Sequence, residues 1–175
     1  MNGSKNKLLL KYCVGGMIFI SALGTLAHFT YGWSGENKVI GLFTAVNEST
    51  WEHMKLIYFP MLIYTLFVWI KLHKTYPASV RAMLISTLAG TGLIPILFYT
   101  YTGILGFMIT PVNLAIYYIS VIISFILFYR LSVKGKPARS SLLLDLSITL
   151  LICLFFLYSY DPPELGIFKD PTIAQ

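Results

Sequence analysis

Residues 111–130 read PVNLAIYYISVIISFILFYR, and this stretch decides the class of fold. It contains no charged residue before Arg130. Twenty helical residues at about 1.5 Å each measure about 30 Å, which matches the hydrocarbon core of a membrane. Backbone groups in lipid need hydrogen-bond partners, and a helix supplies them within one segment. We therefore predict a membrane-spanning helix here.

Four further stretches share this length and apolar composition, at residues 8–30, 49–70, 80–101 and 141–160. None alternates polar and apolar residues as the strands of a membrane barrel do. The whole chain is 57% hydrophobic and only 11% charged, which is too little charge for the surface of a soluble domain. We predict an all-α integral membrane protein, with residues 1–175 forming a single bundle of about five transmembrane helices.

Positive charges are distributed unevenly over the predicted loops. With five spans, the amino terminus lies on the same side as the second and fourth loops, and ten of the thirteen Lys and Arg residues fall there. The other three are Lys38, Lys55 and Lys169. Because basic loops stay in the cytoplasm, we expect a cytoplasmic N-terminus and an external C-terminus. The excess of Lys and Arg over Asp and Glu is then explained by contact with the lipid bilayer, and we expect no nucleic acid as a partner.

Residues able to bind a ligand collect on the outer side. Six of the seven acidic residues lie there, all except Asp145, together with two of the three histidines. Residues 47–53, NESTWEH, begin the second span and are the densest part of this group. We predict an outward-facing ligand site formed by His28, Glu48, Glu52, His53 and Asp161.

One interpretation of this segment is helix capping. Ser49 followed three residues later by Glu52 fits a capping box, and early carboxylates favour the positive end of a helix. Lys55 would then extend to the interface or pair with Glu52. The polar residues would in that case have a structural role.

A second interpretation is a metal site. His28 and His53, with one or two of Glu48, Glu52 and Asp161, offer the nitrogen and oxygen ligands that zinc accepts, with a position left for water. Activation of that water would make the protein a metal-dependent hydrolase facing the outer leaflet. No His-Glu-x-x-His motif is present, so the ligands would come from different helices. Zinc bonds of about 2.0–2.2 Å require the two histidine nitrogens to lie within about 5 Å of each other.

A third interpretation is a polar pocket for a small molecule or a lipid. Glu48 and Glu52, four residues apart, would share a helix face with Lys55 and would raise each other's pKa as like charges. A small proton-coupled transporter is the variant of this interpretation that needs a polar path through the membrane. The inner half offers only Asp145, which favours binding over transport.

The C-terminal segment is too apolar for a featureless linker. Pro162 and Pro163 prevent the last span from continuing as a helix. We expect residues 161–175 to fold back, with Leu165, Ile167 and Phe168 forming a lid over the 48–53 region.

The segment at 47–60 also resembles a family signature. NESTWEH at 47–53, followed by Lys55 and Phe59-Pro60, is similar to the mark of a bacterial family of small multi-pass membrane proteins known only as a domain of unknown function. His28 and the proline-rich tail resemble further family features, so the similarity covers nearly the whole chain. It implies the bacterial inner (plasma) membrane as the location, and it implies no activity, substrate or cofactor.

Overall fold

The computed structural model describes residues 2–135 and 141–173, which contain helices and no strand. Four helices are long and apolar enough to cross a membrane: α1 (Asn2–Trp33), α3 (Thr50–Leu72), α4 (Ser79–Leu105) and α5 (Thr110–Lys134). The others are α6 (Leu142–Tyr158), the single turn α2 (Lys38–Gly41) and the 3₁₀ turn η1 (Gly166–Phe168). The predicted all-α bundle is confirmed.

Of the cations on which the predicted orientation depends, Lys136 and Arg139 lie outside the described residues.

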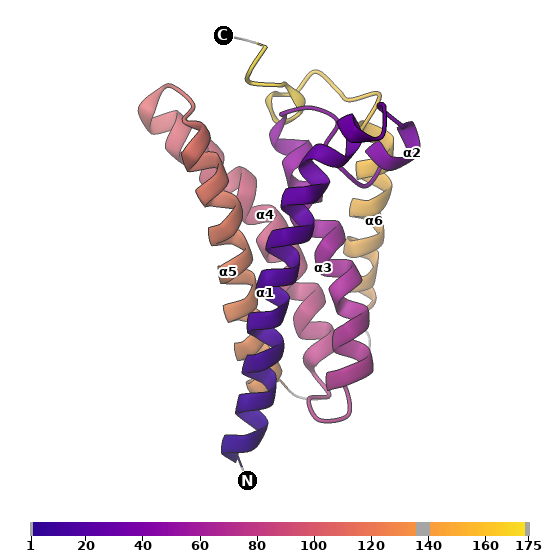
Figure 1. Ribbon diagram of the computed structural model, residues 1–175, viewed down its shortest axis with the longest axis vertical. Coiled ribbons are helices and arrows are strands. Elements are labelled where there is room, and N and C mark those ends of the chain that lie inside the picture. The colour runs from indigo at the N-terminus through magenta and orange to yellow at the C-terminus, as the bar shows by residue number, and fades with distance from the viewer. Residues whose placement is uncertain (1, 136–140, 174–175) are drawn as a thin grey trace.

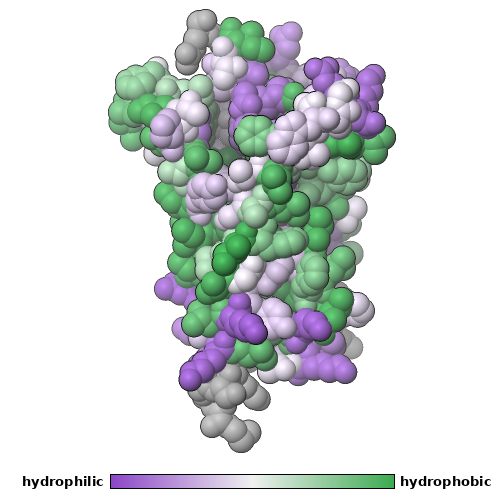
Figure 2. All heavy atoms as spheres, in the orientation of Figure 1, coloured by the Kyte–Doolittle hydropathy of each residue, from purple (hydrophilic) through white to green (hydrophobic). Residues whose placement is uncertain are grey.

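The two termini lie at opposite ends of the bundle (Figure 1). Apolar side chains cover the middle of the visible face, and hydrophilic side chains gather at both ends (Figure 2). We call the end that carries the C-terminal segment the tail end, and the opposite end the N-terminal end. At the tail end the α4–α5 hairpin leans away from α1 and α3 (Figure 1).

Helix α3 is the most deeply buried of the four long helices. It packs against α1 and α4, and α5 closes the group by packing against both of those helices. Two tyrosines fasten α1 to its neighbours. The Tyr64 hydroxyl of α3 donates to the Tyr12 carbonyl at 2.7 Å, and the Tyr117 hydroxyl of α5 donates to the Ile20 carbonyl at 2.8 Å. Each bond satisfies a hydroxyl that would be costly to bury without a partner.

Helix α6 lies outside this group of four and is attached through aromatic rings of α3. The Phe155 ring lies 4.7 Å from the Trp51 ring and 5.2 Å from the Tyr58 ring, measured between centroids. The Tyr58 hydroxyl donates to the Ile148 carbonyl at 2.6 Å. The predicted span at 141–160 therefore corresponds to a helix of 17 residues, at the short limit for crossing a membrane.

The ends of the long helices differ from the predicted ones. Helix α1 continues beyond the predicted end at residue 30 to Trp33. Helix α4 continues beyond the predicted end at residue 101, passes through Gly103 and ends at Leu105. An isolated glycine costs a helix only about 1 kcal/mol, so the helix tolerates it. Gly106 ends α4 because it adopts a φ of 79°, and its amide donates to the Thr102 carbonyl.

Close packing of α1 against α3 depends on Gly24. A Cβ atom there would overlap the Leu56 carbonyl oxygen and the Tyr117 hydroxyl. At Gly15, on the same helix, a Cβ atom would meet nothing within 4 Å. The two glycines therefore form a matched pair, one required by packing and one not.

We predict that Gly24→Val destabilises the protein by about 1–3 kcal/mol, because overpacking forces the helices apart. Gly15→Val places the same β-branched residue in the same helix and should have a much smaller effect. Thermal unfolding in detergent, followed by circular dichroism, measures both. Equal losses in the two variants would contradict the close approach of α1 and α3 at Gly24.

Candidate functional site

The site begins with the way in which α3 starts. The Ser49 hydroxyl accepts a hydrogen bond from the Glu52 amide at 3.3 Å, so Ser49 caps the helix and Thr50 is its first residue. The reciprocal half of the predicted capping box is absent. The Ser49 amide donates to the Asn47 side chain at 2.9 Å instead, and the Glu52 carboxylate accepts from the Val46 amide at 3.0 Å. Glu48 consequently lies in the loop before the helix.

Glu52 turns into the protein and pairs with Lys55. The Lys55 Nζ lies 2.5 Å from Glu52 Oε2, and both side chains are fully buried. The ammonium group also donates to the Gly41 carbonyl at 2.7 Å and to the Ser159 hydroxyl at 2.9 Å. One buried cation thus joins α3 to the end of α2 and the end of α6.

The prediction that Glu48, Glu52 and Lys55 share one face of a helix is wrong. Glu48 precedes the helix, so the spacing of four residues does not align the two carboxylates. The carboxylate that acts to raise the pKa of Glu48 is that of Asp170, not that of Glu52.

Glu48 instead meets two histidines. Its Oε2 lies 3.4 Å from His53 Nε2, and its Oε1 lies 3.7 Å from His28 Nε2. One ligand atom from each of the three side chains can be chosen so that all lie within 4.8 Å of one another. We call His28, Glu48 and His53 the His–Glu cluster. It is assembled from α1, the 42–49 loop and α3, and its side chains are partly exposed.

The hydrogen bonds of His53 limit the ways in which this cluster can exist. His53 Nδ1 lies 2.9 Å from the Ser49 carbonyl oxygen, which can only accept, so Nδ1 carries a proton and donates. In the neutral ring, Nε2 then has a lone pair and no proton, and this lone pair faces a carboxylate oxygen of Glu48. Two acceptors in this position need a positive charge between them, either a proton on Nε2 or a metal ion.

The second histidine completes a set of three side chains that could share a metal ion. His28 also directs Nε2 at Glu48, and its ring centroid lies 5.3 Å from that of His53. Among the described residues no partner of His28 Nδ1 fixes the tautomer of this ring, so Nε2 can donate a proton to Glu48 or offer a lone pair to a metal. A single divalent cation could bind all three side chains. Ligands about 2.0–2.1 Å from a tetrahedral zinc ion are roughly 3.3–3.5 Å apart, and the three ligand atoms here lie within 4.8 Å of one another, so binding would draw the side chains closer together.

The tail reaches this cluster through Asp170. Asp170 Oδ2 accepts from the Glu48 amide at 3.1 Å, and Oδ1 accepts from the Thr172 amide at 2.8 Å. Burial alone would raise the pKa of Asp170, but these hydrogen bonds outweigh burial and lower it. The Phe168 ring packs 4.9 Å from the Trp51 ring, whereas Leu165 remains exposed.

Three of the five predicted ligand residues therefore come together, namely His28, Glu48 and His53. Among the predicted metal ligands, the carboxylate near the histidines is that of Glu48, and Glu52 is occupied by Lys55. Asp161 is exposed just after α6, and the cluster does not include it. The direction of the chain after Pro162 and Pro163 brings Asp170 to the loop instead.

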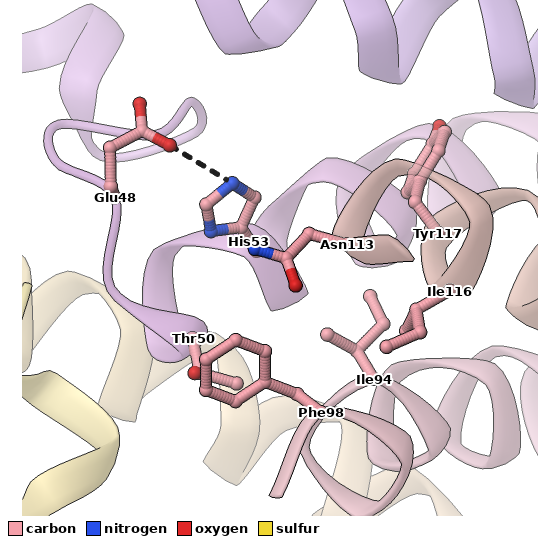
Figure 3. A pocket seen from close by; sticks show the side chains of 8 residues that line it. All are labelled: Glu48, Thr50, His53, Ile94, Phe98, Asn113, Ile116 and Tyr117. Carbon is pink, nitrogen blue, oxygen red and sulfur yellow. Dashed lines mark ion pairs between the residues drawn. The ribbon is translucent and has the colours of Figure 1, made fainter. Parts of the chain in front are cut away.

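A cavity of about 690 Å³ adjoins the cluster, between α1, α3 and α5. Asn113 and Tyr117 line it together with His28, Glu48 and His53. A small cavity of about 40 Å³ lies beside His53, where Figure 3 shows Glu48 joined to the imidazole and Asn113 next to it. Asn113 was not among the predicted ligand residues, although a polar amide near the start of an apolar span was a usable signal.

Comparison with known proteins defines the family of the chain. A model described as a family of unknown function, DUF6512, matches residues 1–175. The chain belongs to this family. No curated protein and no solved structure matches it. This membership agrees with the expected domain of unknown function and assigns no activity to the chain.

We predict that Glu48 contributes to stability in a pH-dependent way. The hydrogen bond with His53 is the largest effect holding the pKa of Glu48 below its usual 4.5. A carboxylate with a lowered folded pKa stabilises the fold above its unfolded pKa, and this contribution is lost as the pH falls through the folded value. The hydrogen bond with His53 requires a proton on His53 Nε2 in place of a metal ion, so the Tm of the metal-free wild type should fall more than that of metal-free Glu48→Gln between about pH 5.5 and about pH 3.5. Glu164→Gln, an exposed carboxylate, is the control and should behave as the wild type does. Parallel pH profiles for all three proteins would disprove the coupling.

A second prediction concerns the buried ion pair. Glu52→Gln keeps an acceptor for the Val46 amide but leaves the Lys55 ammonium buried without a counter-charge, and should cost about 3–5 kcal/mol of unfolding free energy. The double variant Glu52→Gln/Lys55→Met removes the buried charge and should recover most of the loss. Denaturant unfolding in detergent compares the three proteins. A double variant no more stable than the single one would show that charge imbalance is not the cause.

Proposed function

We propose that this protein is a multi-pass membrane protein that binds a divalent metal, zinc by preference, in the His–Glu cluster and uses it to hold a ligand in the adjoining cavity. The supporting observation is the convergence of two imidazole Nε2 atoms on one carboxylate, with ligand atoms of the three side chains within 4.8 Å of one another. Two histidines and a glutamate form the ligand set of zinc sites that keep one position open. The Nδ1 hydrogen bond from His53 to a backbone carbonyl is the kind of contact that orients a metal-binding histidine.

We infer that the tail end, and the cluster with it, faces the outside of the cell. The ends of α1, α3, α4 and α5 at the N-terminal end carry Lys11, Lys71, Arg81 and Lys134, and basic residues flanking membrane spans are retained in the cytoplasm. The bacterial plasma membrane is the location that the signature at 47–60 supports. The lipid bilayer is then the surrounding partner, and the ligand is a small molecule or a lipid.

Ligand binding is favoured over proton-coupled transport by the distribution of buried charge. Within the described residues, Glu52 and Lys55 are the only fully buried charged side chains, and they pair with each other at the tail end. Buried hydroxyls deeper in the bundle, such as those of Ser86 and Ser124, donate to carbonyls of their own helices. No series of titratable groups leads from the cluster toward the N-terminal end in the part of the chain that the structure describes.

Metal-dependent hydrolysis is a second candidate function, because three protein ligands leave zinc a fourth position. Such a position can hold a water molecule whose pKa the metal lowers. Release of fatty acid from an ester-linked lipid by the zinc-loaded protein, and not by His53→Ala, would separate hydrolysis from binding.

We predict about one zinc ion per chain in protein purified without a polyhistidine tag, measured by elemental analysis. His28→Ala, His53→Ala and Glu48→Gln each remove a ligand and should lose most of the metal. His73→Ala removes a histidine at the other end of the bundle, and Asp161→Asn removes an exposed carboxylate near the site. Both controls should keep the wild-type content. Sub-stoichiometric metal in the wild type would leave only an imidazolium–carboxylate pair and would overturn the proposal.

A further inference from the structure

The cavity beside the His–Glu cluster does not end inside the bundle. A groove of about 640 Å³ runs along α1 and is lined by Met17, Ile18 and Ala22, among others. The groove and the cavity share two residues, Thr25 and Tyr118, whose side chains are hydrogen-bonded at 3.2 Å. This hydrogen-bonded pair joins α1 to α5 where the groove meets the cavity, and we call the two hollows together the slot.

The length of the slot matches one leaflet of a bilayer. From Met17 at its far end to His28 at the cluster is eleven residues of α1, or about 16 Å at 1.5 Å per residue. Half of a hydrocarbon core about 30 Å thick is about 15 Å. A molecule filling the slot would extend from the membrane surface to the membrane centre.

The chemistry of the slot changes along this length. At the tail end it contains the His–Glu cluster and Asn113, whose side-chain oxygen already accepts from Tyr101 and whose NH₂ group is therefore the part available to a ligand. Toward the other end the walls are mainly apolar. This pattern fits a molecule with one polar end and one long hydrocarbon chain.

The slot is also open toward the side of the bundle. Ile18, Leu26 and Leu114 line it and are 66%, 52% and 52% exposed. These residues lie on helices long and apolar enough to cross a membrane, so the surrounding medium at this level is hydrocarbon. A lipid could therefore enter from the bilayer without passing through water.

We propose that the slot binds one acyl chain of a phospholipid of the outer leaflet, with a phosphate oxygen at the open position of the metal. The proposal rests on the proposed function for its head-group contact. One divalent cation and the Glu48 carboxylate give the cluster a net charge of about +1, which attracts a phosphate. The lateral opening, the length and the change of polarity favour a membrane lipid over a water-soluble ligand.

The test uses full-length protein in proteoliposomes that contain a phospholipid with a diazirine in the middle of one acyl chain. After irradiation, mass spectrometry of peptides should find the label concentrated on α1 between Met17 and Leu26 and on α5 near Leu114. Leu114→Trp fills the slot and should reduce this labelling roughly tenfold, equivalent to a tenfold loss of occupancy. Ile122→Trp introduces the same ring at an exposed position of α5 outside the slot and should leave it unchanged.

The possible results separate the two proposals. Label spread evenly over exposed residues of α5 and α6, unchanged labelling in Leu114→Trp, or cross-links from the slot to a second copy of the chain would overturn lipid binding, with zinc content unaffected. Slot labelling in a wild type that lacks zinc would overturn the proposed metal site and leave the acyl chain in place. Thermal unfolding checks that the variants fold, and Ala22→Trp, which fills the groove from α1, replaces Leu114→Trp if that variant does not.

Discussion

The hydrogen bond from the Glu52 amide to the Ser49 hydroxyl is the contact on which the rest of the site depends, because it fixes Thr50 as the first residue of α3. A start one turn earlier would put Glu48 on the helix, directly above Glu52, and both carboxylates would point the same way. With the observed start, Glu48 stays in the loop and can turn toward α1. Glu52 sits in the first turn and points into the protein.

The two carboxylates have opposite surroundings as a result. Glu52 is held through Oε2, to which Lys55 brings a positive charge and the Val46 amide a further donor, while its Oε1 is buried without a hydrogen-bond partner in the part of the chain that the structure describes. Glu48 faces two imidazoles, each of which can offer it a proton or share a metal ion with it. The buried Glu52–Lys55 pair therefore holds the 42–49 loop and α6 in place, while the exposed carboxylate of Glu48 remains able to bind a ligand. A structural ion pair and an open cluster lie within one helical turn of each other.

The long helices could be predicted because lipid imposes the same requirement on every span, an apolar stretch of sufficient length. His28 and His53 could be placed near each other because they sit at the same ends of consecutive spans. The choice between Glu48 and Glu52 could not be made, because it depends on a cap at a single residue and on the burial of Lys55. The contact of Asp170 with the loop depends on the path of the chain after Pro163, which leaves no local pattern in the sequence.

The shortness of α6 has a consequence for the membrane around it. Seventeen helical residues measure about 25 Å, against about 30 Å of hydrocarbon, whereas the 28-residue apolar part of α1 exceeds that thickness. Phe155 and the Tyr58 hydroxyl anchor α6 to α3, so sliding or reorienting that helix would break these contacts. A bilayer crossed by α6 would have to thin beside that helix while it stays thick beside α1. Hydrophobic mismatch of this kind would favour regions of the membrane that are thinner than average.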